Sequence, residues 1–560
     1  MQPLDWIVIT LYFAVIGGVA WWYGRHQKDT DDYFLAGRNA GWVVIGASIF
    51  TSNIGSEHIV GLAGQGAFTG MAMAHWELHA WVLIMLAGLF VPFYYKSGVQ
   101  TIPEFLEKRF SARTRWILSI VSLVAYVFTK VSVTVYAGAI VFQALLPDTF
   151  GSPEQAFWIG AFATVVITGV YTVFGGMRAI MATAAPQAVI ILFGSAVITY
   201  IGLDKLGGWG ELVRMSSENA ANFALWRPLS DPDFPWLGVL IASPIIGIWY
   251  WCTDQYIVQR ALSAKDLATA RRGALFGGLL KVWPVLIFLI PGMIGWALHQ
   301  KGLIVIPSKM VDGVAVIDGD RVFPTLVTSL LPVGIRGMIV ACLLSALMSS
   351  LASLFNSSAA LFTVDIYEKL RPGKSEQHLV MVGRIATTVV VGLGLLWIPV
   401  MAKIAGGGLY QYLQSVQGYL APPITAVFLL GLFWKRTNAA GATWALSVGF
   451  LLGMFKLTVQ ALFGATKKYQ EPALLAAIGD FNFLYATGVL MLISVIIMIV
   501  ASLMTPPPAE EKTSGLTYGS IHHLAEHEIK ESWNFGNKLM VGLILLLVGA
   551  MYLYFSFWLK

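Results

Sequence analysis

Several apolar stretches of this sequence, each about as long as a membrane crossing requires, contain side chains that could bind ions or polar ligands. Residues 42–65 include Asn53 and His58, and Lys281 lies well inside residues 273–298. An ionisable group at bilayer depth costs about 2.5–3.5 kcal/mol on insertion scales, so each such residue needs a partner, a cavity or a function. For Lys281 we favour a cavity over an ion pair near the membrane surface.

A carboxylate lies between two histidines in a third apolar stretch, where Glu77 follows His75 and precedes His79. A buried pair of Glu77 with one of these histidines and a contact of Glu77 with a ligand are both compatible with the segment. The histidines share one helical face, but their order does not match the H-E-x-x-H zinc motif and third ligands are not evident. We expect a structural or cavity-lining pair rather than a metal site.

Small and polar residues around Asn53 favour a break in the helix. Such a break is tolerated at membrane depth only where the exposed carbonyls line a cavity or a binding site. Residues 328–361 carry a hydroxyl or an amide on nearly every turn, including Ser349 and Ser350. These serines could simply hold two helices together. If they face the carbonyls of a broken helix, they form an all-oxygen site for a small hard cation.

Aromatic and amide side chains mark two further segments. Pro244 and Gly247 could break a helix just before the cluster that contains Tyr250 and Trp251. Aromatic residues at a helix end are usually an interfacial belt, but aromatic faces also stack on sugar rings. Gln414 lies in a later stretch with two other glutamines, and amides suit the recognition of neutral hydroxyls.

Fourteen apolar stretches must position these side chains. The chain has 560 residues, of which 57% are hydrophobic and 12% charged, and its mean hydropathy is +0.71. These values exclude a water-soluble globule. Each stretch can cross about 30 Å of hydrocarbon as a helix. The predicted spans are residues 5–23, 42–65, 71–95, 117–145, 155–174, 180–203, 235–258, 273–298, 328–361, 379–401, 409–434, 439–463, 479–504 and 537–558.

Lysine and arginine are concentrated in the loops that follow spans one, three and seven, whereas loops 66–70 and 147–156 contain neither. This asymmetry predicts that the basic loops are cytoplasmic and that both termini face outward. The same basic loops explain the net charge of +6, so nucleic-acid binding is not needed to account for it. The two cysteines lie inside apolar stretches, so no disulfide framework is expected.

The motifs resemble those of a known family along almost the whole chain. The segments SNIGSEHIVGLAG, YFLAGR, TIPEFLEKRF, WYWCTDQYIVQRALSAK, PTLVTSLLPVGIRG, SALMSSLASLFNSSAALFTVDIY and APPITAVFLLGLFWKR are similar to signatures of the sodium/solute symporters. The resemblance is strongest to the sodium/glucose cotransporter group. It implies an all-α integral membrane protein of about 14 helices with a LeuT-type core of two inverted five-helix repeats and accessory helices.

The resemblance also implies the domain organisation. The expected parts are an accessory first span with a cytoplasmic loop (1–41), the first inverted repeat (42–203), an extracellular loop (204–234), the second inverted repeat (235–434), accessory spans 12 and 13 (435–504), a polar cytoplasmic linker (505–536) and an accessory last span (537–560).

The resemblance implies three groups of site residues. The sodium ligands would be the carbonyls of Thr51, Ile54 and Ala346 and the hydroxyls of Ser349 and Ser350. The sugar site would consist of Asn53, His58, Glu77, Tyr250, Trp251, Lys281 and Gln414. Tyr250 would be the inner gate, and Trp76 and Tyr410 would lie where outer gates are expected.

Four positions bear on substrate and stoichiometry. Animal glucose cotransporters have histidine where His58 stands, whereas the bacterial galactose transporter has glutamine, and this favours a hexose such as glucose or galactose. Ala184 occupies a position where the family usually has an aspartate linked to a second sodium or to proton coupling. We therefore expect one sodium per sugar. Gly247 and Ala80 replace polar groups of some relatives, which leaves the choice among hexoses open.

The expected function is sodium:sugar symport by alternating access. A symporter for inositol or sialic acid, and a sugar sensor or leak channel on the same fold, remain alternatives. An enzyme is disfavoured because no pair of carboxylates or activated nucleophile is evident. The expected partners are sodium, a sugar and the lipid bilayer, without an organic cofactor, nucleic acid or an obligatory protein partner. The lack of long cysteine-rich loops suggests a bacterial inner membrane.

Overall fold

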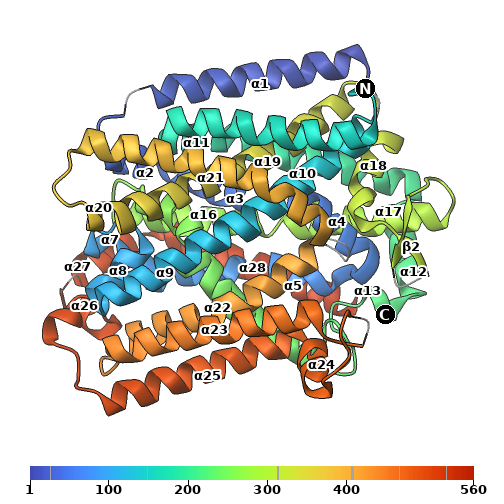
Figure 1. Ribbon diagram of the computed structural model, residues 1–560. Helices are drawn as coiled ribbons and strands as arrows, with labels where there is room; N and C mark the ends of the chain where they lie inside the picture. Colours follow the sequence, from blue (N-terminus) through green and yellow to red (C-terminus); the bar gives the residue numbers. More distant parts are fainter. Residues whose placement is uncertain (26, 148, 312–313, 405–408, 466, 525) are drawn as a thin grey trace.

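The computed structural model describes residues 1–25, 27–147, 149–311, 314–404, 409–465, 467–524 and 526–560, and it leaves the side chains of 310–314, 400–412 and 522–525 undescribed. Long helices run side by side and form one bundle, and both chain termini lie at the same end of it (Figure 1). The described residues are mostly helical, with one small antiparallel hairpin of β1 and β2.

The bounds of the α-helices follow the chain order. They are α1 (Pro3–Gly24), α2 (Thr30–Leu35), α3 (Trp42–Asn53), α4 (Ser56–Thr69), α5 (Ala74–Glu77), α6 (Ala80–Met85), α7 (Val91–Ser97), α8 (Ile102–Arg109), α9 (Ala112–Ala125), α10 (Ser132–Leu145), α11 (Pro153–Leu206), α12 (Trp209–Ser217), α13 (Ala220–Phe223), α14 (Trp236–Ile248), α15 (Gln255–Leu262), α16 (Leu267–Lys281), α17 (Ile290–Gln300), α18 (Val322–Leu330), α19 (Ile335–Ala360), α20 (Glu368–Leu370), α21 (Glu376–Ile404), α22 (Leu409–Phe433), α23 (Ala439–Leu462), α24 (Ala473–Asp480), α25 (Phe483–Met504), α26 (Tyr518–Leu524), α27 (Glu526–Ser532) and α28 (Phe535–Phe557).

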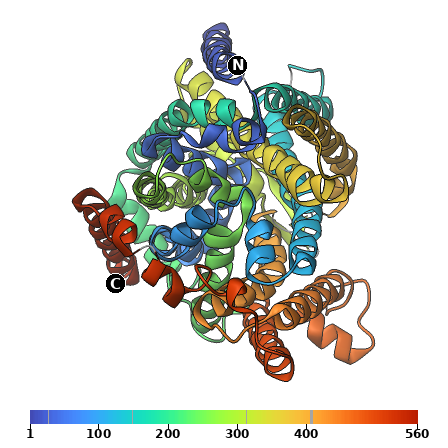
Figure 2. The same cartoon turned by 90° about the vertical axis from the view of Figure 1, so that its left-hand side faces the viewer.

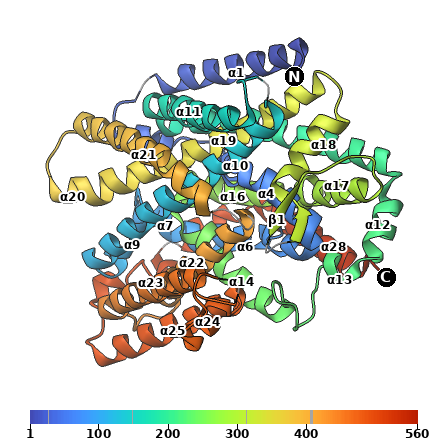
Figure 3. The same cartoon turned by 45° about the vertical axis from the view of Figure 1, so that its right-hand side comes forward.

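Shorter 3₁₀ and π segments and two strands complete the fold. The 3₁₀ segments are η1 (Ala36–Arg38), η2 (Gly70–Met73), η7 (Gly319–Arg321) and η9 (Glu510–Lys512). The π segments are η3 (Leu86–Phe90), η4 (Tyr126–Val131), η5 (Trp249–Thr253), η6 (Val285–Leu289) and η8 (Leu361–Tyr367). Strands β1 (Ser308–Val311) and β2 (Val314–Ile317) lie at the same end of the bundle as α17 and α18 (Figure 3).

Twelve helical stretches of the described residues are long and apolar enough to cross a membrane. The predicted count of fourteen is not confirmed, but two of these stretches contain a break. One is α11, whose 54 residues include Gly176 at φ 53°, a left-handed backbone that interrupts the helix. The other is Ser56–Ser97, which includes the 3₁₀ turn η2. The all-α membrane fold class predicted from the sequence is confirmed.

Burial separates a central helix from peripheral ones. In Ile335–Leu370, which begins with α19, 89% of the apolar window is buried inside the protein, compared with 22% for α1 and 17% for α28. In an end-on view α1, α25 and α28 lie at the rim of the bundle (Figure 2). The central helix α19 packs against α3, α10 and α11. The first and last helices therefore frame a core that the other helices build.

Glycines allow two core helices to cross closely. A Cβ atom added to Gly292 of α17 would collide with the backbone carbonyl of Ala63 in α4. We expect Gly292→Ala to destabilise the protein by about 1–3 kcal/mol through overpacking. Gly392→Ala in α21 is the matched control, because its Cβ would meet nothing within 4 Å. Thermal unfolding in detergent should show a lower Tm for Gly292→Ala alone, and equal Tm values would contradict this packing argument.

Candidate functional site

A break in the first core crossing exposes backbone carbonyls at its centre. Helix α3 ends at Asn53, and Ile54 adopts φ −84° and ψ 89° before α4 begins at Ser56. A continuous helix would direct the N–H of Gly55 at the carbonyl of Thr51, but this N–H donates to the Asn53 carbonyl at 3.1 Å. The break predicted near Asn53 is therefore present. It frees carbonyl oxygens at the buried end of a helix.

A second break follows the aromatic cluster, at Asp254. Helix α14 continues through Pro244 and Gly247 into the π segment η5, and α15 starts at Gln255. The expectation that Pro244 and Gly247 break the helix is wrong. The break is instead stabilised by the Asp254 carboxylate, which accepts a hydrogen bond from the N–H of Tyr256 and caps α15. An N-cap satisfies an otherwise unpaired helix donor.

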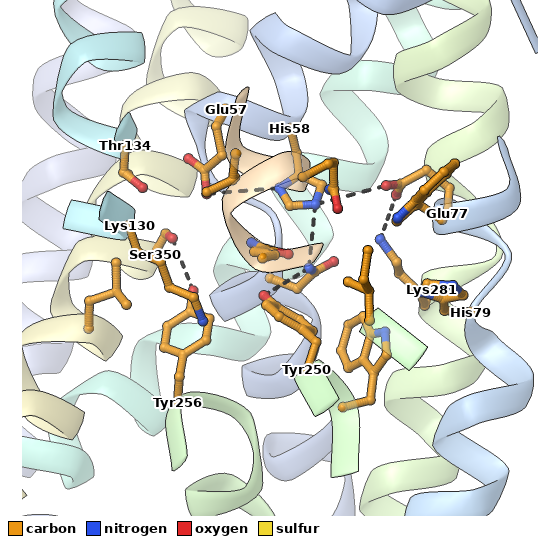
Figure 4. A pocket seen from close by; sticks show the side chains of 18 residues that line it. Glu57, His58, Glu77, His79, Lys130, Thr134, Tyr250, Tyr256, Lys281 and Ser350 are labelled. Carbon is orange, nitrogen blue, oxygen red and sulfur yellow. Dashed lines mark hydrogen bonds and ion pairs between the residues drawn. The ribbon is translucent and has the colours of Figure 1, made fainter. Parts of the chain in front are cut away.

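The two breaks and five neighbouring segments enclose one buried cavity of about 40 Å³. This volume holds about three water molecules, so it is too small for a sugar ring in this conformation. Figure 4 shows the polar side chains converging on it from opposite sides. Its walls are Asn53, Glu57, His58, Trp76, Glu77, His79, Lys130, Thr134, Ile246, Tyr250, Trp251, Tyr256, Lys281, Ser350, Leu354, Leu413, Gln414 and Gln417.

Glu77 and Lys281 form an ion pair on one side of the cavity (Figure 4). The Lys281 Nζ donates to Glu77 Oε2 at 2.5 Å, and the ammonium lies 5.6 Å from the ring centroid of Trp251. Both side chains are almost fully buried, with 3% and 1% of their surface exposed. The sequence left open whether Glu77 pairs with His75 or His79 or contacts a ligand, and its ion-pair partner here is Lys281. Lys281 lines the cavity, as expected, and is also paired.

Asn53 connects the first break to the aromatic cluster. Its Nδ2 donates to the Tyr250 hydroxyl at 3.0 Å and lies 3.4 Å from His58 Nε2. His58 in turn lies 3.9 Å from the carboxylates of both Glu57 and Glu77. These contacts cross the cavity and draw its walls together (Figure 4). The bond from Asn53 to Tyr250 is a directional hydrogen bond, and a ligand hydroxyl could take the place of either partner.

A second lysine, Lys130 of η4, is held in a cage of aromatic rings on the opposite side. Its Nζ lies 2.5 Å from Asp254 Oδ2. The same ammonium lies 4.8–5.0 Å from the ring centroids of Tyr126, Trp249, Tyr250 and Tyr256. Tyr126 also donates its hydroxyl to the other oxygen of Asp254. Cation–π contacts and the ion pair thus compensate for burying the charge.

Tyr256 extends from this cage to the central helix α19. Its hydroxyl donates to the Ser52 carbonyl and lies 3.0 Å from the Ser350 hydroxyl. About one turn after Ser350 on α19, Ser353 shares a hydrogen bond of 2.7 Å with Ser52, between the two hydroxyls. The segment of exposed carbonyls therefore lies beside the serines of α19. The residues alone left this juxtaposition of spans two and nine open, and the family resemblance implied it.

The structure brings the seven predicted sugar-site residues, together with Trp76, to one cavity. The five predicted sodium ligands lie on α3, in the break that follows it and on α19, and Ser350 also lines the cavity. The side chain of Tyr410 lies outside the described residues. Ala184 is buried in α11.

Sequence reasoning missed Lys130, Thr134 and Tyr256. The signal for Lys130 was present, because it is an ionisable residue inside predicted span four.

His75 and His79 bind different partners. The ring nitrogens of His75 lie 3.1 Å from the Tyr552 hydroxyl and from the Leu225 carbonyl, and His79 Nε2 lies 2.7 Å from Ser243 Oγ.

The sequence and the fold both match known proteins. Residues 33–449 match the model of the sodium:solute symporter family. The chain is 37% identical to sodium/glucose cotransporter 4 of Danio rerio, over 95% of this chain and 84% of the relative. The chain belongs to the sodium:solute symporter family. It is also 36% identical to the Homo sapiens sodium/myo-inositol cotransporter, over 94% of this chain and 77% of the relative.

A solved structure agrees with the fold. The outward-open structure of a sodium-coupled sialic acid symporter has 21% sequence identity and a TM-score of 0.74, and the match covers 91% of this chain and 99% of that one. At this identity the likeness shows the fold alone, which is the LeuT-type architecture that the resemblance implied. This member of the symporter family is a multi-pass membrane protein and a sodium-coupled solute transporter, not an enzyme, and sodium is its coupling ion.

Proposed function

We propose that this symporter imports a hexose, such as glucose or galactose, with one sodium ion per sugar. The observation that carries the proposal is the buried cavity between the two breaks, in which Asn53, His58, Glu77, Lys281 and Gln414 present donors and acceptors beside the rings of Tyr250 and Trp251. A few placed polar groups in an otherwise enclosed pocket are typical of small-molecule sites. Aromatic faces and amides together suit a ring that carries neutral hydroxyls.

The charge balance of the cavity favours a neutral substrate over a sugar acid. Its two lysines are paired within the protein, Lys281 with Glu77 and Lys130 with Asp254. Glu57 adds a third carboxylate to this region. A sialic acid would bring another carboxylate to a place where each lysine among the described lining residues is already paired with a carboxylate. The free-energy cost of removing that carboxylate from water would then not be compensated.

For sodium, the support comes from the oxygens at the first break. The carbonyls of Thr51 and Ile54 and the hydroxyls of Ser349 and Ser350 would surround an ion between α3 and α19, with the Ala346 carbonyl as a fifth ligand. Oxygen ligands of this kind suit hard cations. Ala184 supplies no carboxylate for a second ion, which is why we propose a single sodium.

Alternating access would then use Tyr250 as the inner gate. Its hydroxyl accepts a hydrogen bond from Asn53 and its ring contacts Lys130, and these contacts support a gate that is closed in this conformation. Sodium must favour the conformation in which the cavity opens outward, because a ligand of equal affinity for both states shifts nothing. Trp76 and Tyr410 are the proposed outer gates.

Loss of a sodium ligand should raise the sodium requirement without removing the sugar site. We expect Ser350→Ala to increase the sodium concentration for half-maximal uptake by about tenfold, the effect of about 1.4 kcal/mol of lost ion binding. Ser358→Ala, which removes a buried hydroxyl of the same helix, is the control. Sodium activation curves in proteoliposomes measure both. An unchanged curve for Ser350→Ala would contradict the proposed sodium site.

The substrate is tested by competition against labelled glucose under a sodium gradient. We expect unlabelled glucose and galactose to compete best and sialic acid least. Preferential competition by myo-inositol would instead assign the site to a cyclic polyol, the substrate named for the inositol cotransporter relatives. A sensor or leak channel would show sugar-dependent current without accumulation of label.

We also propose a bacterial inner membrane as the location, with both termini on the outer side. The distribution of Lys and Arg among the loops supports this orientation. Labelling of single cysteines introduced at either terminus, in intact cells, tests this orientation. Protection of both termini from a membrane-impermeant reagent would show that they face the cytoplasm instead.

A further inference from the structure

A second cavity, remote from the central one, lies between the first helix and the bundle. It has a volume of about 1000 Å³, at the upper end of ordinary ligand pockets. One wall is α1 and the Arg25 that follows it, and the opposite wall consists mostly of residues of α11 and α19, with Phe142 of α10 and Arg384 of α21. Helix α1 packs along both of these helices at the rim of the bundle (Figure 1). We call this cavity the α1 groove.

The α1 groove runs nearly the full length of a membrane span. From Trp6 to Arg25 the helix rises about 28 Å, which is close to the thickness of the hydrocarbon core. Most of its lining is apolar, and it includes exposed residues such as Ile167, Val170 and Phe174. The groove therefore opens toward the lipid side of the protein. Its shape and lining fit a hydrocarbon chain.

Two arginines, Arg25 and Arg384, also line the groove. Arg25 directly follows the last residue of α1, at the end that the basic loops predict to be cytoplasmic, and its guanidinium lies 3.9 Å from the ring centroid of Trp22. Among the described residues the buried Nε of Arg384 has no hydrogen-bond partner, whereas its Nη2 donates to Gln27 Oε1 at 3.4 Å. Neither guanidinium has an ion-pair partner within the part of the chain that the structure describes.

We propose that the α1 groove binds an anionic phospholipid, with its acyl chain along α1 and its phosphate at Arg25 and Arg384. Guanidinium groups bind phosphate oxygens with charge-assisted hydrogen bonds, and basic pockets at the cytoplasmic side of membrane helices suit anionic headgroups. A free phosphate would leave the apolar wall uncovered. A sterol or a neutral hydrocarbon would leave the two arginines without an anion.

The groove also touches the helix that carries the proposed sodium ligands. Ser345 and Met348 of α19 are part of its lining, and Ser345 lies about one turn from Ser349. The Tyr12 hydroxyl of α1 donates to Ser345 Oγ at 2.5 Å. A bound lipid thus contacts the frame helix and the central helix at once. The lipid site does not depend on which solute the central cavity carries.

Adjacent glycines of α1 offer a matched pair of variants. A Cβ atom at Gly17 or at Gly18 would meet nothing within 4 Å, so both positions accept a large side chain. Gly17 lines the groove, whereas Gly18 is not among the residues that line it. Gly17→Trp should fill the groove, and Gly18→Trp should leave it open.

Native mass spectrometry tests the proposal on the full protein. The protein is reconstituted in an equimolar mixture of phosphatidylglycerol and phosphatidylcholine and extracted in mild detergent, and the retained lipid is identified. We expect phosphatidylglycerol to be retained over phosphatidylcholine by about fivefold, the effect of about 1 kcal/mol from an arginine. Gly17→Trp should lose this lipid, and Gly18→Trp should keep it.

The charge contribution is tested with Arg25→Gln and Arg384→Gln together. We expect lipid to remain bound while the preference for phosphatidylglycerol disappears, with a Tm close to that of the unaltered protein. Equal retention of the two lipids by the unaltered protein would overturn the proposal. An equal effect of the two tryptophan variants would also overturn it, because the lipid would then be bound elsewhere.

Discussion

Replacement of Lys130 by methionine should uncouple sodium entry from sugar entry. The Lys130 ammonium contacts the rings of Tyr250 and Tyr256. Tyr250 belongs to the proposed sugar site and accepts a hydrogen bond from Asn53, and the Tyr256 hydroxyl lies 3.0 Å from that of Ser350, a proposed sodium ligand. Lys130 is therefore a positioning residue that connects the two sites. Without its charge, each tyrosine can move alone.

Parallel fluxes of radioactive sodium and labelled sugar in proteoliposomes measure this coupling. We expect the sodium flux per sugar in Lys130→Met to rise by about tenfold, which corresponds to a coupling free energy of about 1.4 kcal/mol. Methionine keeps the length and apolar volume of the side chain, so packing in the aromatic cage changes little.

A double variant separates coupling from stability. Lys130→Met alone leaves Asp254 buried without its cation, at a cost of about 3–5 kcal/mol. Asp254→Asn added to Lys130→Met should restore much of the stability, because the remaining hydrogen-bond partners of residue 254, the Tyr126 hydroxyl and the Tyr256 N–H, are neutral. We expect the double variant to unfold near the temperature of the unaltered protein and still to leak sodium. A fully coupled double variant would show that Lys130 has only a structural role.

The second large effect is expected from the Glu77 and Lys281 ion pair. Glu77→Gln or Lys281→Met should each destabilise the protein by about 3–5 kcal/mol, since the remaining charge stays buried without its partner. The combined variant removes both charges and should fold better than either single variant. It should nevertheless bind sugar poorly, because hydrogen bonds to charged groups are worth about 1.5–3 kcal/mol each.

Sugar and sodium titrations distinguish this loss of binding from a general defect. In the combined variant the KM for sugar should rise by about tenfold to one-hundredfold, while the sodium concentration for half-maximal uptake changes little. Lys456→Met is a suitable control, since Lys456 is buried in α23 and bonds to Gln460 and the Gly479 carbonyl, none of which lines the cavity. A normal KM for sugar in the combined variant would show that the Glu77 and Lys281 pair does not bind the substrate.

Local composition predicted the features that depend on short segments. Polar residues around Asn53 indicated a broken helix, and the hydroxyls of residues 328–361 indicated a polar central helix. The second break was misplaced, because proline in a membrane helix is tolerated when other groups satisfy the freed backbone. Here the helix continues past Pro244 to Ile248 and into the π segment η5.

Contacts between distant segments could not be predicted from composition. Glu77 and Lys281 are 204 positions apart, and each could have had another partner. The aromatic cage of Lys130 combines rings from η4, η5 and α15, which the chain brings together only in the folded bundle. The resemblance to sodium/solute symporters provided the joint assignment of the sites. It did not include Lys130 or Tyr256.

The most direct test of sodium:sugar symport is the limiting accumulation ratio of labelled sugar in proteoliposomes held at zero membrane potential. With a tenfold inward sodium gradient, a symporter that carries one sodium per sugar should concentrate the sugar about tenfold. At this ratio the free energy of the sodium gradient, about 1.4 kcal/mol, equals the free energy stored in the sugar gradient. About one-hundredfold accumulation would mean two sodium ions. Equal sugar concentrations inside and outside, with or without sodium, would contradict the account.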